Sequence, residues 1–242
     1  MDSCYSAIAS GFSLPRDTAE ELDVRGFIVI KGAITRIQAA QLKAAYDAAV
    51  SGADPDDIKI GSTTTRVSDF VNRGSAFDWI YTHGPILAAC ASVIQRPFKL
   101  STMHARAVHP SAPAQQLHVD FKRQTDGWPM IGFILMIDPF QETNGATRFV
   151  PRSHKWLKTP EDDVRSLHEE QQVVANGPAG SIIIYNGSIW HGHSANETMR
   201  ARRSIQGAYI RRDAQAACNQ KALIRPETFR RISPLARYLL DV

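Results

Sequence analysis

GSIIIYNGSIWHGHSANETMRARRS, residues 180–204, has the pattern of antiparallel strands joined by a tight turn. A run of β-branched residues ends at an Asn186–Gly187 turn, and an extended stretch with His191 and His193 follows it. Side chains two positions apart on a strand point to the same face, so we expect both imidazoles on one side. The segment therefore indicates a β core that carries candidate ligands.

The sequence on both sides of this segment continues the same pattern of short strand-forming runs separated by turns. The expected strands after residue 98 are 99–108, 116–123, 130–137, 146–151, 170–174, 181–185 and 204–210. Most of them have no helix between them, which favours an antiparallel sandwich or jelly roll over a parallel α/β sheet. We predict a mainly β protein with flanking helices, a double-stranded β-helix of the cupin-like jelly-roll type.

Helices are expected on either side of the strand series. A capping box of Thr35 and Gln38 begins an Ala-rich helix after a short strand at 27–30, and Gly52 ends it. Further expectations are a mobile polar loop at 53–75, a helix at 85–95, a helix-like insertion at 160–171 and a helical tail after Pro226. We expect a single domain over residues 1–242, with a helical buttress at about 14–97, a jelly-roll core at about 98–212 and a helical tail at about 213–242.

The composition excludes several classes of protein. With 43% hydrophobic and 21% charged residues the chain is typical of globular proteins. Its three cysteines form no CxxC spacing, so neither a disulfide framework nor a thiolate zinc site is indicated. No apolar run reaches the roughly 18 residues that a membrane span requires, and the N-terminal residues lack a leader pattern. We expect a cytoplasmic protein with no membrane partner.

The net charge of +4 is concentrated toward the C-terminus. Residues 200–242 contain ten Lys/Arg and three Asp/Glu. They lack an aromatic-interleaved basic motif or a helix-turn-helix signature, so we expect no nucleic-acid partner. Solvated arginines, with one or two holding an anionic small molecule, explain the bias more simply.

A second pair of candidate ligands occurs in QLHVDF, residues 116–121, where His118 and Asp120 share a strand face. A His-x-Asp step is common by chance and is weak evidence alone. His191 supplies a third ligand 73 residues downstream. Two histidines and one carboxylate form the facial triad of non-haem Fe(II) oxygenases, which leaves metal positions open for a cosubstrate and dioxygen.

Arg202 follows His191 by eleven residues, and Ser204 lies two further along on the same strand face. A guanidinium fork with an adjacent hydroxyl is a good receptor for a carboxylate. If a metal chelates one end of a dicarboxylic 2-oxo acid, this pair can bind the other end. Arg203 has the opposite parity and is expected at the surface or in an ion pair.

These motifs resemble the phytanoyl-CoA dioxygenase family of Fe(II)- and 2-oxoglutarate-dependent oxygenases. The resemblance rests on QLHVDF, NGATRFVPRSHKW (144–156) and IWHGHSANETMRARRS, which occur in the family's order with the eleven-residue step from His to Arg. RGFIVIKGAI near the start and ISPLARYLL near the end extend it over nearly the whole chain.

The resemblance implies that His118, Asp120 and His191 bind iron and that Arg202 binds the distal carboxylate of 2-oxoglutarate. It implies further cosubstrate contacts from Gln116, Thr147, Met103 and Ser204. His193 stands where the family often has a serine that touches the cosubstrate, and it is a candidate for the same contact. His104 and Arg106, on one strand face, and Lys122, with the parity of His118, are candidates for binding a small-molecule substrate.

The expected reaction uses Fe(II), 2-oxoglutarate and O2, hydroxylates an unactivated C–H bond and releases succinate and CO2. Asp120 argues against a halogenase, in which a small residue replaces the carboxylate. Desaturation, epoxidation and ring rearrangement remain open. Two other classes also remain: a cupin-type metal enzyme that does not use 2-oxoglutarate, and a catalytically silent ligand-binding protein.

Overall fold

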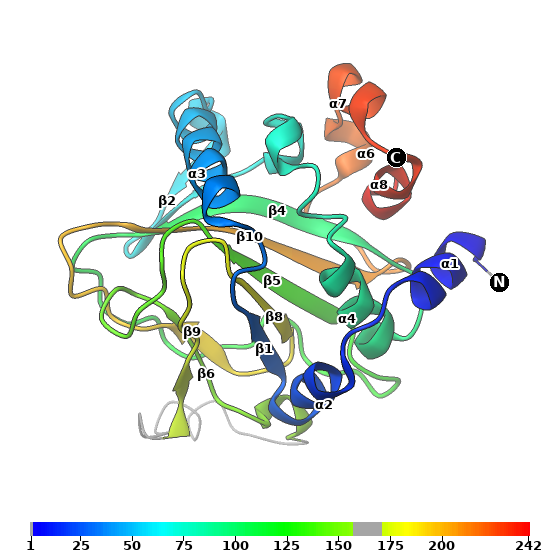
Figure 1. Cartoon of the computed structure of the whole chain (residues 1–242), viewed down its shortest axis with the longest axis horizontal. Coiled ribbons are helices and arrows are strands. Elements are labelled where there is room, and N and C mark those ends of the chain that lie inside the picture. Colours follow the sequence, from blue (N-terminus) through cyan, green and yellow to red (C-terminus); the bar gives the residue numbers. More distant parts are fainter. Residues whose placement is uncertain (1, 157–170) are drawn as a thin grey trace.

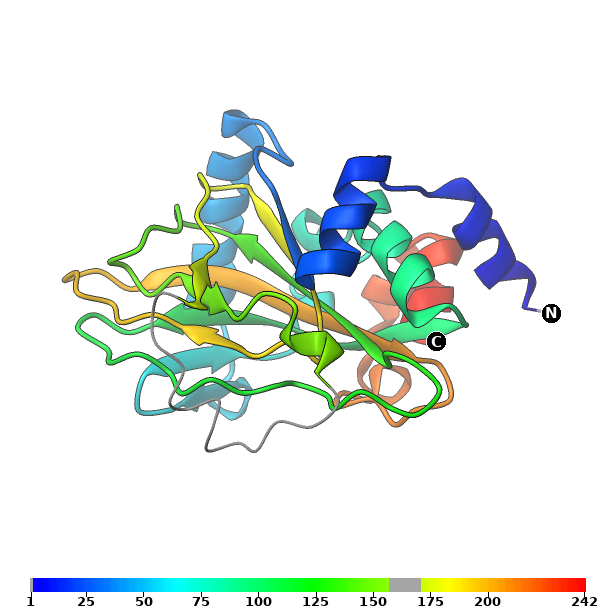
Figure 2. The same ribbon diagram turned by 90° about the horizontal axis from the view of Figure 1, so that it is seen from below.

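The fold is a jelly roll with helices on one side, as predicted. A computed structural model describes residues 2–156 and 171–242. Figure 1 shows α3 and α7 above the larger sheet, α1 and α4 to its right, α2 below β1, and the small sheet with β6 and β9 at the lower left. The view in Figure 2, turned by 90°, shows the strands stacked in layers beside the helices at the two chain ends. The helix-like insertion expected at 160–171 lies, but for its last residue, outside the described residues.

The larger sheet contains seven strands, and all their pairings are antiparallel. Their spatial order is β1 (Phe27–Ile30), β8 (Ile182–Asn186), β5 (Met130–Met136), β10 (Arg202–Arg211), β4 (Phe98–Val108), β3 (Thr64–Val67) and β2 (Ile58–Ile60). The smaller sheet has the order β7 (Val173–Val174), β6 (Thr147–Phe149) and β9 (His191–His193). One face of the larger sheet packs against helices, and the other face packs against the smaller sheet or lines a cavity.

The helices flank the sheet at both ends of the described chain. They are α1 (Ser3–Gly11), α2 (Arg16–Arg25), α3 (Arg36–Ser51), α4 (Gly84–Ile94), α6 (Gln220–Leu223), α7 (Pro226–Arg231) and α8 (Pro234–Leu240). Single 3₁₀ turns occur at η1 (Pro55–Asp57), η2 (Phe70–Asn72), η3 (Ser75–Phe77) and η4 (Ser153–Lys155). The capping box of Thr35 and Gln38 begins α3 and Gly52 caps its end, as predicted. None of the described helices combines the length and apolar character that crossing a membrane requires.

Alternation along β5 divides the core into two parts. Phe133 and Leu135 pack with the helices in the main cluster, whereas Ile134 and Met136 pack between the two sheets. A strand buried on both faces reads as a continuous apolar run, which explains the sequence MIGFILM. The inner face of the same sheet lines the candidate site.

Two sequence expectations about elements are wrong. The strand expected at 116–123 is an irregular segment with one isolated bridge, His118 to His191. It cannot continue as a ladder because the amides of Asp120 and Phe121 both donate to the Gly187 carbonyl. The loop expected at 53–75 contains the β2–β3 hairpin, whose strand β3 pairs with β4 and extends the larger sheet.

The single domain over residues 1–242, and its division into parts at about residues 97 and 212, stay a prediction. Strands β1, β2 and β3 precede residue 98 and nevertheless belong to the same sheet as β4. The two ends of the chain also meet, because the Tyr238 hydroxyl donates to Asp2 at 2.7 Å.

Candidate active site

His118, Asp120 and His191 converge at one point, as the sequence predicted. Their candidate ligand atoms all lie within 4.8 Å of one another. Asp120 Oδ1 is 3.9 Å from His118 Nε2, and Asp120 Oδ2 is 3.6 Å from His191 Nε2. His191 comes from β9, and the two others come from the irregular segment bridged to it. The set offers two imidazole nitrogens and one carboxylate to a single cation.

Backbone carbonyls fix the orientation of both imidazoles. His118 Nδ1 lies 3.1 Å from the Gln116 carbonyl, and His191 Nδ1 lies 2.9 Å from the Ile189 carbonyl. A carbonyl only accepts, so each Nδ1 must carry the proton and each Nε2 keeps its lone pair. The free lone pairs therefore face Asp120, as metal ligands require.

Gly192 allows the irregular segment to approach β9 closely. A Cβ on this residue would lie 3.0 Å from the Gln115 carbonyl oxygen and 3.2 Å from that of Gln116. The amide and carbonyl of His118 pair with those of His191 at 2.9 Å. The glycine between the two histidines of HGH thus helps to bring His118 to His191.

Tyr185 orients the carboxylate of Asp120. Its hydroxyl donates to Asp120 Oδ2 at 2.7 Å. Burial, and next the charge of Asp120, raises the pKa of Tyr185 and keeps this hydroxyl a donor. The ring has room because residue 132, its cross-strand neighbour, is a glycine whose Cβ would lie 2.2 Å from the ring.

The protonation states suit a metal cation. Burial, and next the neighbouring His191, lowers the pKa of His118, which favours the neutral imidazole. Burial raises the pKa of the Asp120 carboxyl, but His191 and the Tyr185 hydroxyl outweigh it and hold the pKa below its ordinary value. The cluster therefore has the form in which these residues bind Fe(II).

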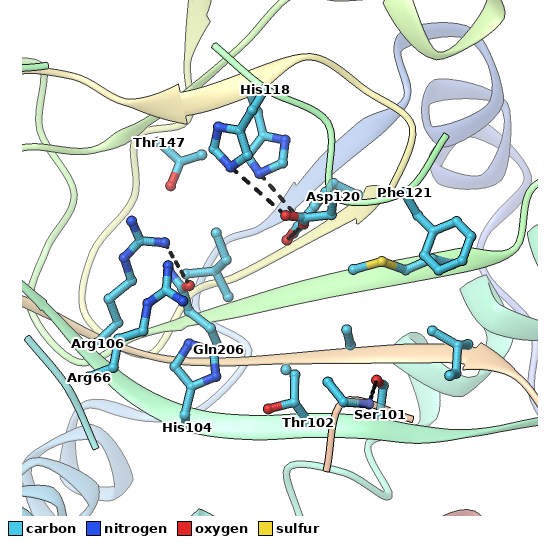
Figure 3. Close-up of a pocket in the computed structure, with 18 of the residues that line it drawn as sticks. Arg66, Ser101, Thr102, His104, Arg106, His118, Asp120, Phe121, Thr147 and Gln206 are labelled. Atoms are coloured by element: carbon cyan, nitrogen blue, oxygen red, sulfur yellow. Dashed lines mark hydrogen bonds and ion pairs between the residues drawn. The ribbon is translucent and has the colours of Figure 1, made fainter. Parts of the chain in front are cut away.

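The triad opens into a cavity of about 600 Å³. That volume is within the range of roughly 300–1,000 Å³ of small-molecule sites. Figure 3 shows His118 and Asp120 above the cavity, with Arg66, Arg106, His104 and Gln206 on one side and Phe121 on the other.

Arg202 lines the same cavity and is 2% exposed. Its Nε and Nη2 donate to the Gly145 carbonyl at 3.0 and 2.6 Å, and Nη1 donates to Ser204 Oγ at 3.2 Å. Its guanidinium carbon lies 4.1 Å from the centre of the Phe140 ring. Burial, and next Arg106, lowers its pKa to about 9, which leaves it charged at neutral pH. Among the residues that the structure describes, no carboxylate pairs with this buried cation.

Comparison with known proteins supports the same assignment. The family model of phytanoyl-CoA dioxygenase matches residues 22–204, which is most of the chain. The chain belongs to the phytanoyl-CoA dioxygenase family. The predicted enzyme class, a non-haem iron and 2-oxoglutarate-dependent dioxygenase, is confirmed at the level of the class.

Curated relatives of this family member are fungal dioxygenases. Dioxygenase trt7 of Aspergillus terreus is 28% identical over an alignment of 208 residues that covers 79% of this chain and 71% of the relative. The multifunctional dioxygenase prhA of Penicillium brasilianum is 30% identical over an alignment of 211 residues that covers 78% of this chain and 69% of that protein.

Solved structures share the fold of this family member. HygX from Streptomyces hygroscopicus, solved with nickel and 2-oxoglutarate bound, superposes with a TM-score of 0.70 at 14% identity, covering 84% of this chain and 90% of HygX. The carbocyclase SnoK from nogalamycin biosynthesis has a TM-score of 0.70 at 14% identity, covering 91% of this chain and 92% of SnoK. The predicted jelly roll is confirmed.

The cavity of this dioxygenase contains several more of the predicted residues. Thr147, His193, His104 and Arg106 all line it. Thr147 and His193 are buried and face each other across the β6–β9 pair. Burial lowers the pKa of His193 to about 4, and it outweighs the hydrogen bond to the Ser194 carbonyl, which raises this pKa. The imidazole is therefore neutral at neutral pH.

Four predicted residues lie elsewhere. Met103 packs in the main core, because its parity on β4 is opposite to that of His104. Gln116 is exposed on the irregular segment and gives its carbonyl to His118. Lys122 is exposed and is not among the residues that line the cavity. Ser204 is buried behind Arg202 and accepts its hydrogen bond, so it contacts the arginine rather than the cavity.

Sequence reasoning missed several polar residues of the cavity, which are Arg66, Ser101, Thr102, Gln115, Tyr185, Gln206 and Gln215. Tyr185 left a signal, since its hydroxyl directly follows the three isoleucines of the run SIIIY and its side chain shares the parity of Ile183. Arg66 left none, because it lies in a polar stretch expected to be a loop.

Proposed function

We propose that this chain hydroxylates an unactivated C–H bond of a small organic molecule, with Fe(II) held by His118, Asp120 and His191 and with 2-oxoglutarate held by Arg202. One observation supports the proposal most strongly. The buried guanidinium of Arg202 pairs with no described carboxylate, and Arg202 lines the same cavity as the triad. A buried cation needs an anionic partner, and the distal carboxylate of 2-oxoglutarate provides one.

Bound Fe(II) and 2-oxoglutarate would supply the activation of O2 and the oxidising power, with succinate and CO2 as the other products. The chain supplies geometry. Tyr185 and two backbone carbonyls hold the ligands in a single orientation before any cation binds. Because little must reorder on binding, the three ligands are arranged for one metal geometry.

The neighbouring side chains select and position the cosubstrate. Ser204 and the Gly145 carbonyl fix the guanidinium fork of Arg202. Thr147 and His193 line the cavity as neutral polar groups, suited to contact 2-oxoglutarate through hydrogen bonds. Phe121 lies on the opposite side of the cavity (Figure 3), and Met130, which packs with it in one apolar cluster, also lines the cavity.

We further propose a cytoplasmic enzyme whose partner is a small molecule and neither nucleic acid nor a membrane. Cys4, Cys90 and Cys218 are all free thiols, in keeping with a reducing compartment. The size of the cavity suits a small substrate together with the cosubstrate.

The proposal is tested with the purified chain, Fe(II), 2-oxoglutarate and O2, by measuring metal-dependent 2-oxoglutarate binding and succinate release. We expect Arg202→Gln to weaken 2-oxoglutarate binding about 30- to 5,000-fold, since losing one partner of a buried charge pair costs roughly 2–5 kcal/mol. Arg203→Gln is the matched control, because Arg203 is adjacent on β10 but pairs with Asp138 and Asp47. Equal binding by wild type and Arg202→Gln would instead favour a metal enzyme that does not use 2-oxoglutarate.

A further inference from the structure

Two arginines face each other on the wall of the cavity opposite the triad. Arg66 on β3 and Arg106 on β4 are direct cross-strand partners in an antiparallel pair, and both line the cavity. Like charges directly opposite each other destabilise a sheet. Arg66 is exposed and Arg106 is half-buried, so solvent screens part of their repulsion, and the fold places two positive charges side by side at one end of the cavity.

Among the described residues, no carboxylate forms an ion pair with either arginine, although the charge of Asp120 acts on Arg106 from across the cavity. Arg106 hydrogen bonds only to neutral amides, to Gln115 at 3.1 Å and to Gln206 at 3.4 Å, and its buried Nε has no partner. The buried Nε2 of His104, which also lines the cavity, has no partner either. Burial, and next Arg66, lowers the pKa of Arg106 to about 10, so it is charged at neutral pH. The wall therefore presents unsatisfied donors and positive charge to the cavity.

The charges of the cofactors do not account for this excess. Among the described residues lining the cavity, the formal charges are those of Asp120, Arg202, Arg66 and Arg106. Fe(II) carries two positive charges, which Asp120 and the metal-chelating carboxylate of 2-oxoglutarate balance. The second carboxylate balances Arg202. The half-buried Arg106 then has no anionic partner among these groups, and the exposed Arg66 adds a second positive charge beside it.

The other end of the cavity contains an apolar cluster, with Ser101, Thr102 and Gln215 also in the lining. Met130, Ala208 and Ile210 form a small cluster with Phe121 and Ala216, and all five line the cavity. Figure 3 places Phe121 on the side away from Arg66 and Arg106, with the candidate ligands above the space between them. A molecule that spans this space would have a charged end, an apolar end and its middle near the triad.

We propose that the substrate is a carboxylic acid with an apolar body, bound by Arg66 and Arg106 through its carboxylate and by the Phe121 and Met130 side through its body. The proposal rests on the proposed function and names the substrate class for that site. Oxidation would fall on a carbon of the apolar body, at a distance from the carboxylate that the separation of the arginines from the triad sets.

The test uses the whole chain loaded with Mn(II), which allows binding without turnover, and saturating 2-oxoglutarate. Octanoate and its neutral analogue octanamide are titrated by calorimetry. We expect octanoate to bind at least about tenfold more tightly, since a hydrogen bond to a charged group is worth roughly a factor of 10–100. Arg106→Gln and Arg66→Gln should remove this preference, and Arg106→Lys should keep part of it.

Two controls separate this role from a structural one. Lys59→Gln removes a charge from the neighbouring strand β2, where Lys59 is the cross-strand neighbour of Arg66 but does not line the cavity. This substitution should change octanoate binding by less than about threefold. The unloaded Arg106→Gln protein should melt about 1–4 °C higher than wild type, because repulsion is relieved. A structural arginine would instead give a lower melting temperature.

Three outcomes overturn the proposal. Equal affinity of the wild type for octanamide and octanoate would remove the role of the carboxylate. If Arg106→Gln weakened 2-oxoglutarate binding as much as Arg202→Gln does, Arg106 would be assigned to the cosubstrate, and the proposed function would stand. Failure of the wild type to bind 2-oxoglutarate with Mn(II), seen before any acid is added, would remove both proposals.

Discussion

The two walls of the cavity differ in how their polar groups are satisfied. On the wall of the triad, the protein supplies the partners: carbonyls for both imidazoles and the Tyr185 hydroxyl for Asp120. On the opposite wall, Arg106 Nε and His104 Nε2 are buried without partners, and Arg66 adds a second positive charge. One wall is complete before anything binds, and the other is not.

This difference separates two kinds of chemistry in one pocket. Ligands that must hold a metal in one geometry gain from fixed neighbours, because any freedom lost on binding weakens the site. A buried polar group without a hydrogen-bond partner destabilises the protein until a ligand pairs with it. Such groups therefore discriminate strongly between ligands that can form this hydrogen bond and ligands that cannot. We infer that the first wall serves the shared oxidation and the second serves substrate selection.

The largest effect is expected from removing a metal-ligand side chain on the wall of the triad. We expect His191→Ala to lower metal affinity and succinate release by more than about 100-fold, since the loss of an outer partner alone costs roughly 10–100-fold. Metal titration and a succinate assay measure the effect. His109→Ala is the matched control, because His109 bonds to Thr65 and lies outside the cavity lining. Undiminished metal binding by His191→Ala would contradict the assignment of the triad.

A smaller change loosens the same wall and keeps its ligands. Tyr185→Phe removes the hydrogen bond to Asp120, and we expect metal affinity to fall about tenfold. Gly132→Ala should act in the same direction, because its Cβ would lie 2.2 Å from the Tyr185 ring and displace it. Both variants should keep the octanoate preference of the opposite wall. If neither changes metal affinity, the carboxylate does not depend on Tyr185.

The smallest effect is expected outside both walls, on the outer face of β10. Arg203→Gln removes ion pairs with Asp138, at 2.7 Å, and with Asp47. These groups are partly exposed, so we expect a loss of about 1 kcal/mol in unfolding free energy and about 2–4 °C in melting temperature. Thermal unfolding and the 2-oxoglutarate titration check both parts. A change in 2-oxoglutarate affinity would show that the outer face is coupled to the site.

Much of the fold and the centre of the site could be predicted, because both leave local signals. The runs KLSTMHARAV and SIIIY identify strands through composition and period, and the capping box identifies the start of α3. His118, Asp120, His191 and Arg202 lie at characteristic spacings in the sequence, and the structure brings them to one cavity.

Other residues could not be placed from such signals. Met103 and His104 are adjacent on β4, so one strand cannot present both to the cavity. Gln116 was expected on a strand, but in the structure this segment is irregular and forms only a single bridge, from His118 to His191. The parity of a strand is readable in sequence, but its absolute face depends on what packs against it.

The sequence by itself determined most of the strand series, the capping box of α3, and the positions of the candidate metal ligands and of the candidate cosubstrate arginine, because these depend on periods and spacings within short segments. Only the tertiary structure decided that Tyr185 reaches Asp120 and that Arg66 lies opposite Arg106, since each pair is joined by strand pairing between distant segments. Register between strands is a property of the packed sheet. It created the open cationic wall, and with it the proposed choice of substrate.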